Sequence, residues 1–432
     1  MCHGEGDPKD FRMLGSLGDY DGDGDMAEGI FYAIEGLQSM LYGAIRAYAG
    51  EVPGTPIVYD AHTYPYFFVD TDGDGAANEE ETSDTNAYNA WTARLAKAAY
   101  NYQTSIKDPG AYAHGGKYII QLLYDSVEDL NQALSSPVDL SAARRIDHGH
   151  FAGSEPAFRN WDEEGIVPRH CTKCHTAAGL PFFLTENAHT SQSPSNGLNC
   201  ATCHDDLTTF SIYEVPSVRF PQGTIVDSGD PRSNLCLNCH QGLSSIASVN
   251  AAIAGLDLDT VAKPLEFLNI HDLAAASTLF GTEVKGAYEY NGKRYVGRFA
   301  HVDGFRNCTQ CHSIHGLEVE AEACGACHQG VEGKADLVNI RNPEDTTDYD
   351  GDGDATEGLA GEVETVRQLL YASMQEYAAA GAGAPIVYEP DAYPYFFADA
   401  NENGQIDADE AVQPNRYADW TPRLLRAAYN FQ

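Results

Sequence analysis

The sequence predicts a mainly α-helical fold with much irregular loop, in which two copies of one helical module flank a middle segment rich in cysteine and histidine. Three observations support this prediction. A long stretch recurs near the other end of the chain, apolar residues in both copies return every three or four positions, and ten of the eleven cysteines share one short pattern. We place the domains at 1–140, 141–330 and 331–432, because a chain of 432 residues has room for about three.

The repeat relates residues 19–103 to residues 348–432 without a gap, at the constant offset that separates Asp19 from Asp348. "DYDGDGD" opens both copies, and "PIVY", "YPYFF" and "AAYN" recur in register. A repeat of this kind indicates a duplicated structural unit.

Each copy begins with a predicted amphipathic helix. Positions three and four apart share one face of a helix, so we expect the apolar stripe of both helices to be core. The stripe is Ile30, Ile34, Leu37, Leu41, Ile45 and Tyr48 in the first copy, and Leu359, Val363, Val366, Leu370, Met374 and Tyr377 in the second. A third helix is expected after His114, with the stripe Ile119, Leu123, Val127, Leu130 and Leu134.

One small β-hairpin is predicted in the middle segment. Residues 283–290 and 293–296 flank Asn291-Gly292, a dipeptide that favours the tight type I′ turn of a two-residue hairpin. The alternation places Val284 and Tyr288 on one face of this expected ribbon.

The cysteines carry the strongest chemical signal, because they form five copies of Cys-x-x-Cys-His. The copies are Cys171/Cys174/His175, Cys200/Cys203/His204, Cys236/Cys239/His240, Cys308/Cys311/His312 and Cys324/Cys327/His328. Two thiols at this spacing add to the two vinyl groups of one haem, and the following imidazole becomes a ligand of its iron. The motifs therefore predict five covalently bound c-type haems and a multihaem core at 141–330.

Two other interpretations of the cysteines are weaker. Paired Cys-x-x-Cys motifs can bind zinc, but a zinc site does not require histidine after each second cysteine. Disulfide pairing would leave an odd thiol and would not explain the histidines. Cys2-His3 resembles the end of a sixth motif, since Cys324/Cys327/His328 precedes the second copy of the repeat much as Cys2-His3 precedes the first.

Histidines outside the motifs are numerous enough to supply second ligands to the irons. The predicted distal ligands are His114, His150, His189, His271, His301 and His315. His315 follows His312 by three residues and is expected to reach a neighbouring haem. Two imidazoles per iron favour electron transfer and leave no open position for substrate.

Four acidic loops are predicted calcium sites. Two of them fill the ligand positions of a twelve-residue EF-hand loop, with oxygen ligands at alternate positions, Gly at position 6 and Glu at position 12. The ligands are Asp70, Asp72, Asp74, Asn78 and Glu81 in the first copy, and Asp399, Asn401, Asn403, Asp407 and Glu410 in the second. Two less complete loops are Asp19, Asp21, Asp23 and Asp25, and Asp348, Asp350, Asp352 and Asp354.

The less complete loops lack a ligand at position 12, where Ile30 and Leu359 stand, and Glu28 and Glu357 are candidates to replace it. The alternative for all four loops is a solvated acidic turn without an ion.

The overall charge limits the partners. A formal charge of −38 disfavours nucleic acid and anionic membranes and favours cations or basic partners. No run of about 18 apolar residues is present, so we expect no membrane span. The start shows no basic and apolar leader pattern, and we expect the sequence to be a piece of a longer protein.

With these motifs, the chain resembles the large multihaem c-type cytochromes of bacteria that respire metals or exchange electrons outside the cell. The resemblance rests on the five motifs, the "CHSIH" of residues 311–315, and residues 111–126 and 281–302. It implies export, low-potential haems with two axial histidines, a periplasmic, outer-surface or extracellular location, and redox partner cytochromes or mineral and metal acceptors. It also admits an oligomer or filament. The acidic loops resemble EF-hand or dockerin-type sites.

Three functions compete at this point. The first is an electron carrier in anaerobic respiration or extracellular electron transfer. The second is a multihaem oxidoreductase of the octahaem type acting on nitrogen or sulfur oxyanions, which usually carries a lysine in place of one motif histidine. No Cys-x-x-Cys-Lys occurs here, and the negative charge disfavours anionic substrates. The third is a calcium-dependent adhesion or scaffold protein, for which five tethered cofactors are more than scaffolding requires.

Overall fold

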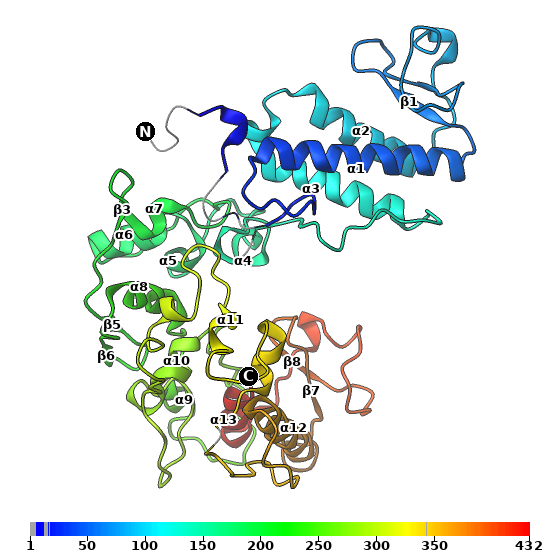
Figure 1. Ribbon diagram of the computed structural model, residues 1–432. Coiled ribbons are helices and arrows are strands. Elements are labelled where there is room, and N and C mark those ends of the chain that lie inside the picture. The colour runs from blue at the N-terminus through cyan, green and yellow to red at the C-terminus, as the bar shows by residue number, and fades with distance from the viewer. Residues whose placement is uncertain (1–5, 13–15, 17, 148, 343) are drawn as a thin grey trace.

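The computed structural model describes residues 6–12, 16, 18–147, 149–342 and 344–432. Helices are the main regular elements among these residues, and the strands form only two-stranded hairpins (Figure 1). None of the helices in the described ranges is long and apolar enough to cross a membrane. Cys2 and His3, the half motif at the start, lie outside the described residues.

The first module is a bundle of three helices, α1 (Ile30–Glu51), α2 (Ala93–Lys107) and α3 (Ala111–Asn131), which pack against one another (Figure 1). The predicted stripe of α1 from Ile34 to Tyr48 is confirmed as core, and Leu37 and Leu41 are fully buried. The opposing face of α3 is buried along Ile119, Leu123, Val127 and Leu130.

A hairpin follows the first helix of each module. In the first module β1 (Ile57–Tyr59) pairs with β2 (Phe67–Val69), and in the second β7 (Ile386–Tyr388) pairs with β8 (Phe396–Ala398) in the same antiparallel register. The Tyr-Pro peptide bond before the second strand is cis in both.

The second module begins with α12 (Leu359–Tyr377), continues through a short π-helical turn, η7 (Ala378–Ala382), and ends with α13 (Pro422–Phe431). Thr421 caps α13 as Thr92 caps α2, each hydroxyl accepting a hydrogen bond from a leucine N–H three residues on, at 3.1 Å. The helix starts are therefore specified by the same local sequence in both copies.

The prediction that the second apolar stripe is core is wrong for the first half of α12. Leu359, Val363 and Val366 are exposed, and Met374 is the one fully buried member of the predicted stripe. The reason lies in the neighbours, because α3 covers these positions in the first module and no described helix takes its place beside α12.

The middle segment consists of short helical turns joined by loops. Its α-helices are α4 (Pro156–Arg159), α5 (Thr172–His175), α6 (Gly179–Glu186), α7 (Cys200–Cys203), α8 (Pro231–His240), α9 (Ile246–Ala252), α10 (Ala275–Phe280) and α11 (Ala321–Cys324). Two further hairpins pair β3 (His204–Asp206) with β4 (Ser211–Ile212), and β5 (Val218–Arg219) with β6 (Ile225–Val226).

The 3-10 turns within the described ranges are η1 (Pro8–Asp10), η2 (Asp84–Asn86), η3 (Gly149–Phe151), η4 (Gly281–Glu283), η5 (Cys308–Gln310), η6 (Lys334–Asn339) and η8 (Gln413–Asn415). A small core of its own, including Leu180, Phe220 and Phe280, lies within the middle segment.

The hairpin predicted at residues 283–296 is wrong, because these residues form no strands. A turn does occur at Asn291-Gly292, and Val284 and Tyr288 are both buried. The backbone of Tyr288 bonds instead to the side chain of Asn430 on α13, donating to its Oδ1 at 2.7 Å and accepting from its Nδ2 at 2.9 Å. A tertiary partner thus replaces the strand ladder.

The middle segment shares one core with the second module. Phe267 stacks on Trp420, the Ala262 N–H donates to the Trp420 carbonyl, and the Tyr429 hydroxyl donates to the Gly286 carbonyl at 2.8 Å. The domain boundary near residue 330 stays a prediction. Residues 246–288, which precede it in the sequence, pack in the core of the second module.

Candidate functional site

Each complete motif forms one helical turn. The His175, His312 and His328 N–H groups donate to the carbonyl of the first cysteine of the same motif, at 2.8–3.1 Å. On a helical turn, positions i, i+3 and i+4 share one side. The local backbone therefore brings two thiols and one imidazole together at each motif.

Four motif histidines face a second histidine from another part of the chain. The His175 and His271 Nε2 atoms are 3.5 Å apart, and their ring centroids 5.7 Å. The other facing pairs are His240 with His150 at 5.7 Å between centroids, His204 with His315 at 6.3 Å, and His328 with His301 at 6.2 Å.

This spacing fits one metal ion between two imidazoles. An imidazole nitrogen binds a first-row metal at roughly 2 Å, so two axial nitrogens on opposite sides lie about 4 Å apart and their ring centroids about 6 Å apart. The ring centroids of the four pairs lie 5.7–6.3 Å apart, which fits this separation, and each pair contains the histidine that follows a pair of thiols. The chain's own residues thus fit c-type haem with two axial histidines.

Backbone carbonyls orient three of the motif histidines through hydrogen bonds to Nδ1. The Nδ1 atom of His175 bonds to the Ala157 carbonyl at 2.8 Å, and that of His240 to the Leu273 carbonyl at 2.8 Å. His204 Nδ1 lies 2.9 Å from the Phe210 carbonyl. A carbonyl accepts only from a protonated Nδ1, so these contacts leave Nε2 as the free ligand atom.

A tight turn at residues 271–273 serves two motifs at once. His271 and Leu273 both have positive φ angles, of 83° and 55°, which non-glycine residues seldom adopt. The turn presents the His271 ring to His175 and the Leu273 carbonyl to His240. The sequence gives no signal for these carbonyl partners, because any residue type supplies the acceptor.

Burial favours the neutral form of two of the paired imidazoles, His150 and His175. Burial, with the neighbouring His240 as a second cause, lowers the pKa of His150 to about 4. Burial also lowers the pKa of His175, and the nearby His271 adds to that shift while the bond to Ala157 opposes it. A neutral ring is the form that binds metal.

The motifs are close neighbours of one another. The Cys174 and Cys239 thiols are within hydrogen-bonding reach, which links the first and third motifs. The thiols of Cys236 and Cys308 make the same contact between the third and fourth motifs, and this bond lowers the pKa of Cys308 below its usual value. The helical turns that carry these thiols, α5 with α8 and α8 with η5, also pack together.

The five motifs are not equally enclosed, although their sequence pattern is the same. Cys327 of the fifth motif and Cys200 of the second are exposed, whereas the other cysteines of the complete motifs are half-buried. The helix α11 ends at Cys324, and the Cys327 N–H donates to the Cys324 carbonyl at 3.1 Å. The local turn, rather than a packed core, therefore positions the Cys327 thiol. Its role as a haem tether stays a prediction that rests on the motif and on the facing pair of His328 and His301.

Two predicted distal ligands, His114 and His189, are placed differently. His114 is exposed and bonds through Nδ1 to the Asp108 carboxylate at 2.8 Å. The His189 ring stacks on Phe183. Within the described residues no contact joins either of them to a motif histidine, and His312 has no facing imidazole. The distal roles of His114 and His189 stay predictions.

The acidic loop at residues 70–81 folds around its own carboxylates. Asp70 and Glu81 are buried, and with Asp72 they place one carboxylate oxygen each within 4.8 Å of one another. Asp70 accepts hydrogen bonds from the Gly73 and Gly75 N–H groups. Backbone donors thus hold the acidic groups in one concave turn.

The matching loop at residues 399–410 has the same construction. Asp399 and Glu410 are buried; the Gly404 N–H donates to Asp399 at 2.8 Å and the Ala400 N–H to Glu410 at 2.7 Å. Within this loop the Asn401 and Asn403 amides both donate to Asp407.

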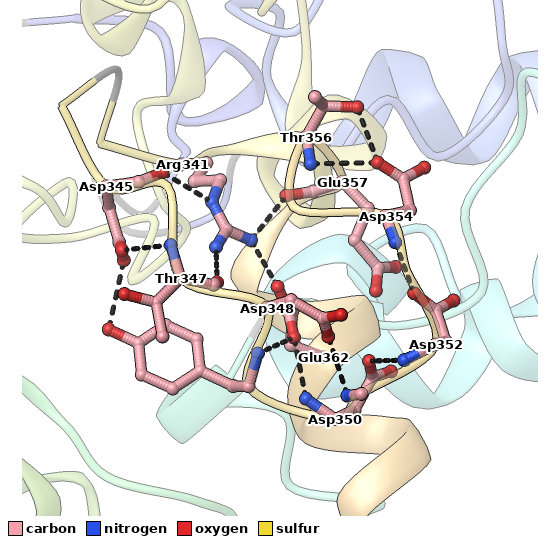
Figure 2. A network of polar contacts seen from close by, with 12 residues as sticks. Arg341, Asp345, Thr347, Asp348, Asp350, Asp352, Asp354, Thr356, Glu357 and Glu362 are labelled. Carbon is pink, nitrogen blue, oxygen red and sulfur yellow. Dashed lines mark hydrogen bonds and ion pairs between the residues drawn. The ribbon is translucent and has the colours of Figure 1, made fainter.

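The two less complete loops gain acidic groups that the simple spacing does not supply. Glu357 lies with Asp350 and Asp352 in one group of carboxylates within 4.8 Å. Figure 2 shows the side chains of Asp348, Asp350, Asp352 and Asp354 along this loop. In the first copy, burial and then the nearby Asp21 raise the pKa of Glu28 to about 7.

Sequence reasoning missed Glu362 and Arg341. Glu362 is buried on α12, accepts from the Tyr349 and Asp350 N–H groups, and pairs with the Arg341 guanidinium at 2.5 Å (Figure 2). The signal was present, since Glu362 stands where the first copy has the buried Ala33. A charged residue at a core position of one copy marks a local polar network.

Comparisons with known proteins give one consistent result. The chain is 26% identical over 383 residues to the C-type polyheme cytochrome OmcC of Geobacter sulfurreducens, a match that covers 76% of this chain and 46% of that protein. The C-type polyheme cytochrome OmcB of the same species is also 26% identical, over 67% of this chain and 41% of its own length. The chain thus spans about half the length of the curated relatives it matches.

No family model and no solved structure matches the chain. Together with the five motifs and the facing histidines, the two relatives support a multihaem c-type cytochrome.

Proposed function

We propose that the chain transfers electrons through a series of covalently bound c-type haems, in anaerobic respiration or extracellular electron transfer. The observation that carries this proposal is the pairing of four motif histidines with four histidines from elsewhere in the chain. A haem iron held by two imidazoles supplies one-electron chemistry with little rearrangement of its ligands.

The residues divide the work of holding the cofactors. The cysteine pairs would tether the haems, the motif histidines would each hold an iron, and His150, His271, His301 and His315 would supply a second imidazole to four of them. Cys2-His3 would add a sixth site. The exposed His114 and His189 are candidate second ligands for this site and for the fourth motif, whose His312 has no facing imidazole among the described residues.

The order of the motifs in space supports a series rather than isolated centres. The third motif, on α8, touches the first through Cys239 and the fourth through Cys236. We infer that the third motif would hold a haem between those of the first and fourth motifs, where it would supply one-electron transfer between them. The histidines and thiols of the chain would set these positions, because each haem would be attached to its own helical turn.

We propose calcium for the four acidic loops. The support is the carboxylate groups at 70–81, 19–23 and 348–362, together with the backbone donors that curl each loop. Oxygen ligands at alternate positions of a glycine-bent loop are those that calcium prefers. Bound calcium would offset part of the charge of −38 and rigidify the two modules.

We propose a place outside the cytoplasm, in the periplasm, on the outer surface or beyond the cell, with cytochromes or mineral and metal acceptors as redox partners. The proposal follows from the resemblance to multihaem cytochromes, and a strongly acidic surface suits cationic acceptors. An oligomer or filament is compatible with it.

Electron paramagnetic resonance of the oxidised holoprotein tests the axial pairs. We expect only low-spin ferric haem in the wild type. His271→Ala should convert one haem equivalent to high spin, because it removes the partner of His175. His62→Ala is the matched control, since His62 is exposed in the first module and should change nothing.

The outcomes separate the competing functions. A wild-type protein with a stoichiometric high-spin signal would favour the oxidoreductase over the carrier. Mass spectrometry of the matured chain should find at least five haems attached, and a smaller number would contradict the assignment of the motifs. A low-spin spectrum unchanged by His271→Ala would refute the axial pair.

A further inference from the structure

The second module has an apolar surface that its first copy keeps covered. Ile34 is 4% exposed, whereas Val363 at the same repeat position is 65% exposed; Leu37 is fully buried, whereas Val366 is 44% exposed. Leu359 and Leu369 extend the surface along the same helix. We call these four residues, Leu359, Val363, Val366 and Leu369, the α12 stripe.

The first module shows what covers the corresponding surface. There α3 packs along α1 over most of its length, and the two helices run in the same direction. Gly116 brings the backbone of α3 close to α1, since a Cβ at this position would lie 2.7 Å from Ile30 Cγ2. The following apolar residues Ile119, Ile120 and Leu123 are buried.

The middle segment does not replace α3 at this surface. It instead makes with α13 the polar contacts that α3 makes with α2. Arg94 of α2 pairs with Asp129 of α3, whereas Arg423 of α13, at the same repeat position, pairs with Asp259 of the middle segment. Asn101 bonds to Ser126 of α3, whereas Asn430 bonds to the Tyr288 backbone. These contacts occupy α13 and leave the first half of α12 bare.

We propose that the α12 stripe binds an amphipathic helix with the pattern of the first half of α3. The expected partner places a small residue against Leu359 and Val363 and apolar residues three, four and seven positions later, as Gly116, Ile119, Ile120 and Leu123 do. Burying an exposed apolar stripe against a complementary apolar helix face lowers the free energy, because it removes apolar surface from water. The stripe holds its partner through apolar contact, because α13's polar anchors are already engaged.

Binding of a synthetic peptide tests this proposal. The probe is residues 109–131 of this chain, titrated into the haem-loaded protein by isothermal calorimetry, and we expect saturable binding of one peptide. Val363→Asp and Val366→Asp should each weaken binding by at least about tenfold, because the complex would bury an unpaired carboxylate. Gln368→Asp is the matched control, on an exposed position outside the stripe, and should bind like the wild type.

A second experiment does not require the free peptide to form a helix in solution. Residues 104–134 are fused directly after Gln432, in register with the repeat, and hydrogen exchange of residues 359–370 is measured with and without the extension. We expect at least tenfold slower exchange in the extended chain and loss of that protection with Val363→Asp.

Two results would overturn the proposal. One is a folded protein that neither binds the peptide nor gains protection from the extension. The other is a dimer of the unextended chain that Val363→Asp dissociates, which would assign the α12 stripe to a second copy. Both readouts are independent of haem reduction and hence of the electron-transfer proposal.

Discussion

The two copies of the repeat fold alike and are packed differently. Both form a long helix, a hairpin of identical register, a 3-10 turn and a helix capped by threonine. In the first copy α3 covers the long helix and Tyr100 is 72% exposed. In the second copy the middle segment covers α13, Tyr429 is 3% exposed, and the long helix is partly bare. Local sequence thus specifies the elements, and the neighbours decide which of their faces become core.

The largest expected difference between the copies lies at the aromatic residue of the last helix. Tyr429→Ala should destabilise the second module by about 3–5 kcal/mol, because it empties a packed site and leaves the Gly286 carbonyl without its donor. Tyr100→Ala should change stability by less than about 0.5 kcal/mol. Hydrogen exchange of α13 and α2 measures both changes. Equal effects would mean that the middle segment does not dock on α13.

The next effect is at the long helices. Ile34→Ala should destabilise α1 by about 2–4 kcal/mol because the side chain is enclosed by the three-helix core. Val363→Ala should alter α12 by less than about 0.5 kcal/mol, since water already reaches the side chain. Exchange rates of the α1 and α12 amides give both numbers. A costly Val363→Ala would show that the α12 stripe is covered in the chain itself.

The next prediction concerns the calcium affinities of the two complete loops, at residues 70–81 and 399–410. Glu81→Gln and Glu410→Gln should each weaken calcium binding to their own loop at least about tenfold, or about 1.4 kcal/mol, since position 12 offers both carboxylate oxygens. Calorimetry on chelator-treated protein counts the ions and gives their affinities. If neither change alters the titration, the loops are solvated acidic turns.

The smallest predicted effect concerns one charge that differs between these loops. The Arg46 guanidinium lies over Gly75 in the first loop, whereas Gln375 at the same repeat position donates to the Gly404 carbonyl at 2.9 Å. Arg46→Gln should tighten calcium binding about twofold to fivefold, or about 0.5–1 kcal/mol, by removing a nearby cation. Gln375→Arg should have the opposite sign. An Arg46→Gln loop with weaker affinity would contradict this account.

The sequence predicted local features well and tertiary ones poorly. The stripe of α1 and the Cys-x-x-Cys-His turns depend on spacing of three and four residues, which is visible in the chain. The exposure of Val363 depends on whether another helix is present, and the loss of the hairpin at residues 283–296 depends on Asn430, more than a hundred residues away. Spacing carries no information about such distant partners.

The candidate site divides in the same way. The cysteines and motif histidines follow from one pattern, and His150, His271, His301 and His315 follow from the surplus of histidine. Which motif each distal histidine faces could not be predicted, because the pairs join residues far apart in the chain. The carbonyls that orient His175 and His240 have no side-chain signature at all.

The distance along the chain between facing histidines has a consequence for folding. His175 and His271 are 96 residues apart, so a metal shared by both rings acts as a crosslink that closes a very long loop. Closing a loop of about 100 residues restricts the unfolded chain by an amount comparable to a disulfide, roughly 4–5 kcal/mol. Because the middle segment has so little regular structure, bound haems would be the main stabilisers of its fold. Cofactor attachment and folding of that segment should therefore be one event, while the three-helix bundle at the start folds independently.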